Sequence, residues 1–146
     1  MSDTGRVLIA DDDDAIRNLV SKVLELEGIP HDAVRDGQAA IECLEKHDYA
    51  LLLVDLMMPV LSGFDVLEYL KQHPRKPGTV LVMTAASDTD LRRLDGNVVT
   101  TVVRKPFDIQ QLAILVRDAA VRSAEASRNQ RGDNILPFPT SGTGNS

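Results

Sequence analysis

The sequence predicts an α/β domain built on a doubly wound parallel sheet. Apolar runs alternate five times with segments of helical period, which is the order of strands and helices in such a domain. Two of these runs, at residues 51–54 and 80–83, contain no polar residue, as expected of strands that helices cover on both faces. A chain of 146 residues, 43% of them hydrophobic, is long enough for one such domain.

The same pattern predicts where each strand and helix lies. Strands are expected at residues 6–10, 29–34, 50–55, 79–84 and 98–104. Helices are expected at residues 14–27, 38–46, 63–72, 88–94 and 109–126. The first helix has a regular apolar stripe and stops before Gly28, whereas the fourth contains only Leu91 and Leu94 as apolar residues and precedes Gly96. We therefore expect the fourth helix to be short and mobile.

Composition divides the chain into a domain at residues 1–126 and a tail at residues 127–146. The tail is rich in Ser, Arg, Asn, Gln, Gly, Pro and Thr, so it cannot bury a core and is expected to be largely disordered. An apolar island at residues 135–139 is either a docking peptide for a partner or plain linker. The tail has no helix-turn-helix pattern, so we expect no DNA binding by this chain.

Charge and hydropathy argue against several functional classes. The net charge of −6 and the lack of a basic stripe argue against binding to nucleic acid or to an anionic membrane. No apolar run approaches the ~18 residues of a membrane span, and no secretory signal follows the first methionine. We therefore expect a cytoplasmic protein without membrane insertion. The single cysteine, Cys43, lies among apolar helix residues and is expected to pack in the core, and the three histidines lack a metal-ligand spacing.

Polar side chains follow four of the expected strands at the point where each strand ends. Asp11 and Asp12 follow the first strand, Asp55 closes the third, Thr84 the fourth and Lys105 the fifth. An acidic run by itself is well explained as a first helical turn that offsets the helix dipole, which is our interpretation of the next two residues, Asp13 and Asp14. Several polar groups at one edge of a parallel sheet instead indicate a binding site, and crowded carboxylates there predict a divalent metal.

Four motifs in this order and spacing resemble the receiver domain of two-component response regulators, as found in chemotaxis regulators. They are Val-Leu-Ile-Ala-Asp-Asp-Asp at 7–13, Leu-Val-Asp-Leu-Met-Met-Pro at 53–59 with Ser-Gly-Phe-Asp at 62–65, Val-Met-Thr-Ala at 82–85, and Arg-Lys-Pro-Phe at 104–107. The resemblance covers roughly residues 5–123 and implies a flavodoxin-like (βα)5 fold with strand order 2-1-3-4-5.

The resemblance also implies a site that carries a phosphoryl group. Asp55 would accept the group from a phosphohistidine and become a 4-aspartylphosphate. Asp12, Asp55 and the main-chain carbonyl of Met57 would hold Mg²⁺ directly, and Asp11 would act through a metal-bound water. Lys105 would place a positive charge against the phosphate on the side opposite the metal.

By the same resemblance, Thr84 would be the switch residue. Its hydroxyl would donate to a phosphate oxygen and draw in the loop before the fourth helix. The partners would be a sensor histidine kinase or a histidine phosphotransfer protein, and an unknown downstream protein that binds through the fourth helix, fifth strand and fifth helix. We expect no enzymatic activity beyond the protein's own phosphorylation and dephosphorylation.

Two alternatives to a stand-alone receiver stay open. The chain could be a receiver fragment of a larger hybrid kinase or transcriptional regulator. It could also be an aspartyl-phosphate phosphatase, but that class would need a second Asp two residues after the nucleophile, where this chain has Met57.

The chain departs from the family pattern at positions that bear on signalling. Val102 stands three residues before Lys105, where many receivers carry Tyr or Phe, so an aromatic rotamer switch is not available there. We expect the signal to leave through the fourth helix and the loop after Thr84. Met57 and Ala86 also lack polar groups to position an attacking water, which predicts an acyl phosphate of moderate to long lifetime.

Overall fold

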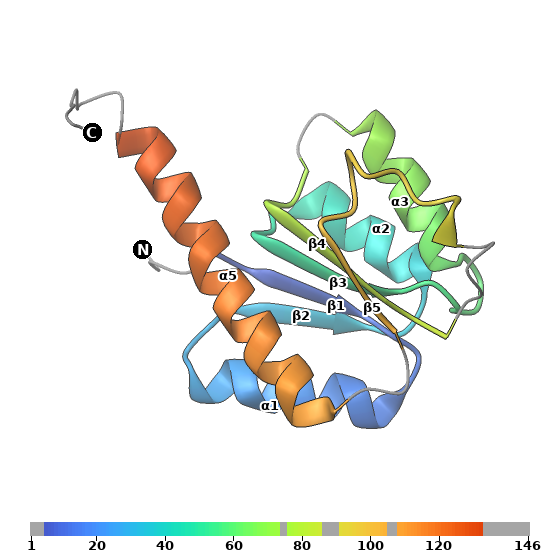
Figure 1. The fold of residues 1–146 in the computed structure, drawn as a ribbon, viewed down its shortest axis with the longest axis horizontal. Helices are drawn as coiled ribbons and strands as arrows, with labels where there is room; N and C mark the ends of the chain where they lie inside the picture. Colours follow the sequence, from blue (N-terminus) through green and yellow to red (C-terminus); the bar gives the residue numbers. More distant parts are fainter. Residues whose placement is uncertain (1–4, 74–75, 86–90, 105–107, 133–146) are drawn as a thin grey trace.

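The computed structural model describes residues 5–73, 76–85, 91–104 and 108–132, and within them a five-stranded sheet forms the centre of the molecule (Figure 1). The strands are β1 (Val7–Ala10), β2 (His31–Val34), β3 (Leu51–Asp55), β4 (Thr79–Thr84) and β5 (Thr101–Arg104). They lie in the order β2-β1-β3-β4-β5, and every neighbouring pair is parallel. The predicted doubly wound sheet and its strand order are confirmed.

Helices cover both faces of this sheet. They are α1 (Asp14–Leu26), α2 (Gly37–Lys46), α3 (Gly63–Gln72) and α5 (Ile109–Gly132). In Figure 1, α1 and α5 lie on one side of the sheet, and α2 and α3 lie on the other. Among the helices that the structure describes, none is both long enough and apolar enough to span a membrane.

Alternate residues of the central strands β1, β3 and β4 enter two separate hydrophobic cores, because side chains of a strand point to opposite faces. Val7, Leu51 and Leu81 pack in the core beneath α1 and α5. Their neighbours Leu8 and Leu52 pack in the core beneath α2 and α3. This two-sided burial explains why the central strands carry unbroken apolar runs.

The region between β4 and β5 differs from its predicted form. Residues 88–90 of the predicted fourth helix lie outside the described residues, whereas Leu91 is helical and a turn follows it from Arg92. The amide groups of Val98 and Val99 both donate to the carbonyl oxygen of Asp95, at 2.9 Å each. That turn uses the backbone donors of two residues expected to begin the fifth strand, so β5 starts only at Thr101.

The last helix is longer than predicted, because α5 continues past residue 126 to Gly132. Residues 121–131 include Ala, Glu, Gln and Arg, which favour helix, and the helix ends at a glycine. The first six residues of the predicted tail, 127–132, therefore belong to a helix. Residues 133–146, with the apolar island, lie outside the described part of the chain. Cys43 is partly buried against the core beneath α2 and α3, as expected.

Candidate functional site at the carboxyl ends of the strands

The parallel register brings the predicted polar residues to one edge of the sheet. Ala10 pairs with Val54, so Asp11 and Asp55, the residues that follow them, lie side by side. Asp55 in turn pairs with Met83, the residue before Thr84. Asp11, Asp55 and Thr84 are 0%, 2% and 0% exposed, and they are the only buried polar or charged residues within the described part of the chain. These three buried residues therefore all lie at this edge of the sheet.

The carboxylates of Asp11, Asp12 and Asp55 form a cluster. Each can present an oxygen such that the three oxygens lie within 4.8 Å of one another. Two unit charges ~4 Å apart repel by about 1 kcal/mol in bulk water and by ~4 kcal/mol at an effective dielectric constant of about 20. Hard oxygen donors at this separation fit Mg²⁺, which takes carboxylates and keeps several waters. Burial of two of the three residues distinguishes the cluster from an ordinary acidic surface.

The loop after β3 is held close to Asp55. The amide of Met57 donates to Asp55 Oδ1 at 3.1 Å, which directs the loop back over the carboxylate. The amide of Gly63, the first residue of α3, donates to the carbonyl oxygen of Leu56 at 2.9 Å. A Cβ atom on Gly63 would lie only 2.4 Å from the carbonyl oxygen of Asp55, so only glycine allows α3 to begin so close to the end of β3.

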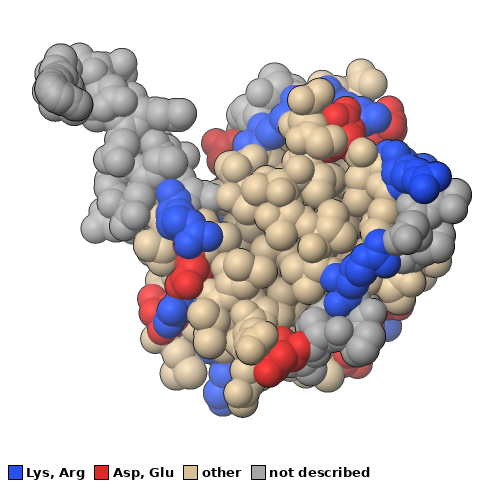
Figure 2. All heavy atoms as spheres, in the orientation of Figure 1, with Lys and Arg blue, Asp and Glu red and all other residues tan. Residues whose placement is uncertain are grey.

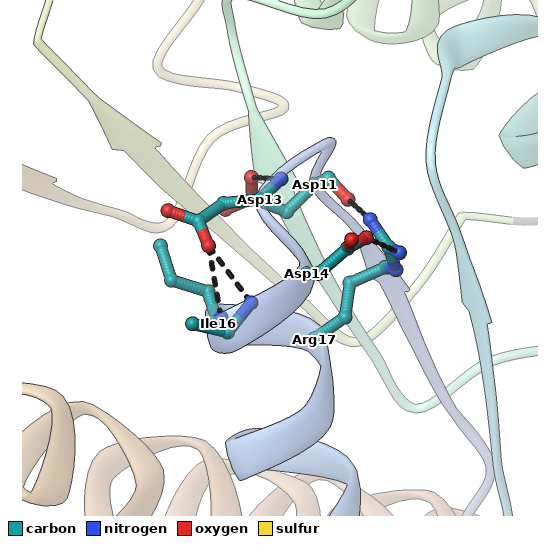
Figure 3. Close-up of polar contacts among 6 residues, drawn as sticks. Asp11, Asp13, Asp14, Ile16 and Arg17 are labelled. Carbon is teal, nitrogen blue, oxygen red and sulfur yellow. Dashed lines mark hydrogen bonds and ion pairs between the residues drawn. The ribbon is translucent and has the colours of Figure 1, made fainter.

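The consecutive aspartates differ in their contacts, and Figure 3 shows those of Asp11, Asp13 and Asp14. Asp13 is the N-cap of α1, and its side chain accepts hydrogen bonds from the amides of Ala15 and Ile16 at 2.9 and 3.3 Å. Asp14 lies in the first turn of α1 and forms an ion pair with Arg17. The capping and first-turn roles predicted for Asp13 and Asp14 are confirmed, which leaves Asp11 and Asp12 for the cluster.

Arg17 is a residue of this site that the sequence reasoning missed. Its Nη1 donates to the main-chain carbonyl oxygen of Asp11 at 2.8 Å, while its Nη2 faces Asp14 (Figure 3). The spacing of three residues between Asp14 and Arg17 is a helical ion-pair signal that could have identified the second contact. The contact with the Asp11 carbonyl oxygen depends on how the chain turns from the end of β1 into α1, and no local sequence pattern predicts that geometry.

The structure describes only one of the two other predicted residues, Thr84 and Lys105. Thr84 closes β4 and is fully buried, and its partner in the β5 register is Arg104. Lys105 follows Arg104 but lies outside the described residues, as does Ala86. The described site therefore consists of the aspartate cluster, the Met57 loop, Thr84 and Arg17.

Comparisons with known proteins agree with this fold. Residues 7–117 match the family model of the response regulator receiver domain. The chain is 31% identical over 134 residues to the transcriptional regulatory protein CpxR of Escherichia coli K12, and 29% identical over 129 residues to the transcriptional regulatory protein SrrA of Staphylococcus aureus. These matches cover 90% and 87% of this chain but 56% and 52% of the relatives, so the chain spans about half of their length.

A solved structure gives the same picture of the fold. The receiver domain of the Francisella response regulator 1452 superposes with a TM-score of 0.69 at 27% sequence identity. That match covers 82% of this chain and 98% of the other chain. The part of the chain that superposes is thus nearly a whole domain of that protein.

Proposed function

Because this chain belongs to the response regulator receiver domain family, we propose that it is a switch in which Asp55 accepts a phosphoryl group from a phosphohistidine. The observation that carries the proposal is the carboxylate cluster, in which a buried Asp55 lies within 4.8 Å of Asp11 and Asp12 oxygens. The donor would be a sensor histidine kinase or a histidine phosphotransfer protein. The protein would act on no separate substrate.

The chemistry follows from the residues at the site. A carboxylate oxygen of Asp55 attacks phosphorus, the new O–P bond forms, and the N–P bond of the phosphohistidine breaks so that the imidazole leaves with its electron pair. Mg²⁺, held by Asp11, Asp12, Asp55 and the Met57 carbonyl oxygen, would neutralise charge on the transferring group. The bond from the Met57 amide to Oδ1 would orient the Asp55 carboxylate for this attack.

Thr84 and Lys105 would convert phosphorylation into a conformational change. A hydrogen bond from the Thr84 hydroxyl to a phosphoryl oxygen is worth about 1.5 to 3 kcal/mol. A complete switch from 1:99 to 99:1 needs about 5.5 kcal/mol, so Thr84 cannot supply it alone. Lys105 and the metal ion would therefore supply the remaining free energy.

The changed surface would be read by a downstream protein at β5 and α5. Figure 2 shows that the face carrying these elements is broadly uncharged, with Lys and Arg gathered near its edges. Val102 of β5 and Ile114 of α5 are 38% and 50% exposed. An uncharged face and exposed aliphatic side chains on these elements favour a protein partner over a nucleic acid.

A second candidate is that the chain is the receiver part of a longer transcriptional regulator. The matched relatives are transcriptional regulatory proteins of which the chain spans about half, and this observation favours the candidate. DNA binding would then belong to a segment beyond this chain. A stop codon directly after Ser146 in the natural gene would favour the stand-alone protein instead.

Phosphorylation is tested by incubating the protein with acetyl phosphate and Mg²⁺ and measuring the intact mass. We expect the mass of one added phosphoryl group in the wild type and no addition in Asp55→Asn. Asp118→Asn removes an aspartate from α5, far from the cluster in sequence, and should behave as the wild type. Persistence of the adduct in Asp55→Asn would contradict the proposal. Because Met57 and Ala86 lack polar groups that could position an attacking water, the adduct should outlast a few seconds without a phosphatase.

A further inference from the structure

We infer that Arg17 is a positioning residue for the metal-binding end of β1. It holds the peptide that joins Asp11 to Asp12, and so sets the directions in which their two carboxylates leave the main chain. The inference rests on the proposed function, because it takes the carboxylate cluster to bind Mg²⁺.

Arg17 contacts the main chain at the peptide between Asp11 and Asp12. Its Nη1 donates to the carbonyl oxygen of Asp11 at 2.8 Å, and this oxygen belongs to the same planar peptide as the amide nitrogen of Asp12. A fixed carbonyl therefore fixes the backbone of both residues. The guanidinium is itself held by its ion pair with Asp14 (Figure 3), and the Arg17 side chain is only 16% exposed, so it is a constrained donor.

Other bonds also restrain this turn. The amide of Asp11 donates to the carbonyl oxygen of Val34 on β2 at 3.1 Å. The amide of Asp13 donates to Asp11 Oδ1 at 2.8 Å, which orients one carboxylate from within the turn. Asp12 is exposed, and the amide of Asp12 shares its peptide with the oxygen that Arg17 holds. Arg17 thus adds a second side-chain link, beside the Asp13 cap, between the turn and α1.

The need for such a restraint comes from electrostatics. The cluster carboxylates repel one another before a cation arrives, and a turn free to move would let Asp12 rotate away. The bond from Arg17 would keep the carboxylates close together, so that less ordering is needed when the cation binds. Residues that orient ligands in this indirect way often change metal affinity by about 10- to 100-fold when they are replaced.

The sign of the effect separates positioning from simple charge. Replacing Arg17 with a neutral residue makes the surroundings of the cluster more negative, and Coulomb's law alone then predicts tighter binding of a divalent cation. A positioning role predicts weaker binding. The two explanations therefore give opposite changes in Mg²⁺ affinity.

Isothermal titration calorimetry of the full chain with Mg²⁺ alone tests the inference. We expect Arg17→Gln to weaken Mg²⁺ affinity by about tenfold. Arg122→Gln, which removes the same charge from an exposed position in the second half of α5, should leave the affinity near that of the wild type. Unchanged or tighter binding in Arg17→Gln would overturn the inference. Thermal unfolding confirms that each variant is folded.

Two further variants keep the test decisive. Arg17→Lys retains the charge but cannot reach both partners with a planar fork, so it should also bind Mg²⁺ more weakly, and wild-type affinity in this variant would overturn the inference. Asp14→Asn keeps the Arg17 bond to Asp11 and should lose less affinity than Arg17→Gln. If the wild type itself binds no Mg²⁺, or if Asp55→Asn binds it equally well, the proposed function fails instead.

Discussion

Tyr49 donates a hydrogen bond from its hydroxyl to Asp32 Oδ2 across 2.6 Å, and this bond spans the amino end of β1. Tyr49 precedes β3 and Asp32 lies in β2, and these two strands are neighbours of β1 on opposite sides. Asp32 also forms an ion pair with Arg6, at 3.3 Å. The edge strand β2 is therefore tied to the centre of the sheet by side chains at the end remote from the carboxylate cluster.

Replacing Tyr49 with Phe should destabilise the protein. The change removes the bond to Asp32 while keeping the buried ring, so we expect a loss of about 1 to 2 kcal/mol in the free energy of unfolding. Urea unfolding measures it. A double-mutant cycle with Asp32→Ala, which removes the acceptor, isolates the pair, and an interaction energy near zero would show that the bond contributes nothing.

The same phenol should make stability depend on pH in alkaline solution. Burial raises the pKa of Tyr49 above its ordinary value, and the hydrogen bond to Asp32 raises it further. The folded protein then keeps the proton to higher pH than the unfolded chain, whose tyrosines titrate near pH 10. The stabilisation is complete below that pH and is lost as the pH rises above it. Relative to Tyr49→Phe, the wild type should lose up to about 1.4 kcal/mol per pH unit there.

Val60 should be a site where substitution stabilises the protein. Its φ of 69° is unfavourable for a β-branched residue, and its side chain is 75% exposed. Relief of about 1 to 3 kcal/mol of strain in Val60→Gly exceeds the added chain entropy, so we expect a net gain of about 1 kcal/mol. Val102→Gly, in β5 with ordinary backbone, should instead lose stability. Thermal unfolding of both variants checks the contrast.

Gly63→Ala should be costly because its new Cβ would meet backbone. That atom would lie 2.4 Å from the Asp55 carbonyl oxygen and 2.6 Å from Leu56 Cα, so α3 must move away from β3. We expect a loss of about 1 to 3 kcal/mol in urea unfolding. Gly96→Ala is the matched control, since a Cβ there meets nothing within 4 Å. Equal stability of the two variants would contradict the close approach.

Thr84→Ala should separate phosphorylation from switching. The variant should still take a phosphoryl group from acetyl phosphate, because Thr84 is neither acceptor nor metal ligand in the proposed chemistry. Loss of a hydrogen bond worth about 1.5 to 3 kcal/mol should shift the conformational equilibrium roughly ten- to a hundredfold. Amide hydrogen exchange across residues 91–100, with and without phosphorylation, measures the response. A response equal to the wild type's would remove Thr84 from the switch.

Much of the candidate site could be predicted from strand ends alone. Asp11, Asp55 and Thr84 each follow a buried run, and parallel strands bring such positions to one edge, so the sequence predicted their proximity. The contact of Arg17 with the Asp11 carbonyl could not be predicted. It depends on the angle at which α1 leaves the strand, and that angle follows from packing of the whole helix on the sheet.

The sequence by itself determined the alternation of strands and helices, the two-sided burial of the sheet and the polar residues at its edge, because these depend on residue type and on periods of 2 and 3.6 residues. The tertiary structure alone decided where β5 begins, that Arg17 meets the Asp11 carbonyl oxygen, and that Tyr49 meets Asp32. These features join residues through hydrogen bonds whose geometry exists only after the strands have paired and the helices have packed. The opening acidic run shows both contributions: its place in the sequence predicted that Asp13 and Asp14 begin the helix, and the fold brings Asp11 and Asp12 into a cluster with Asp55.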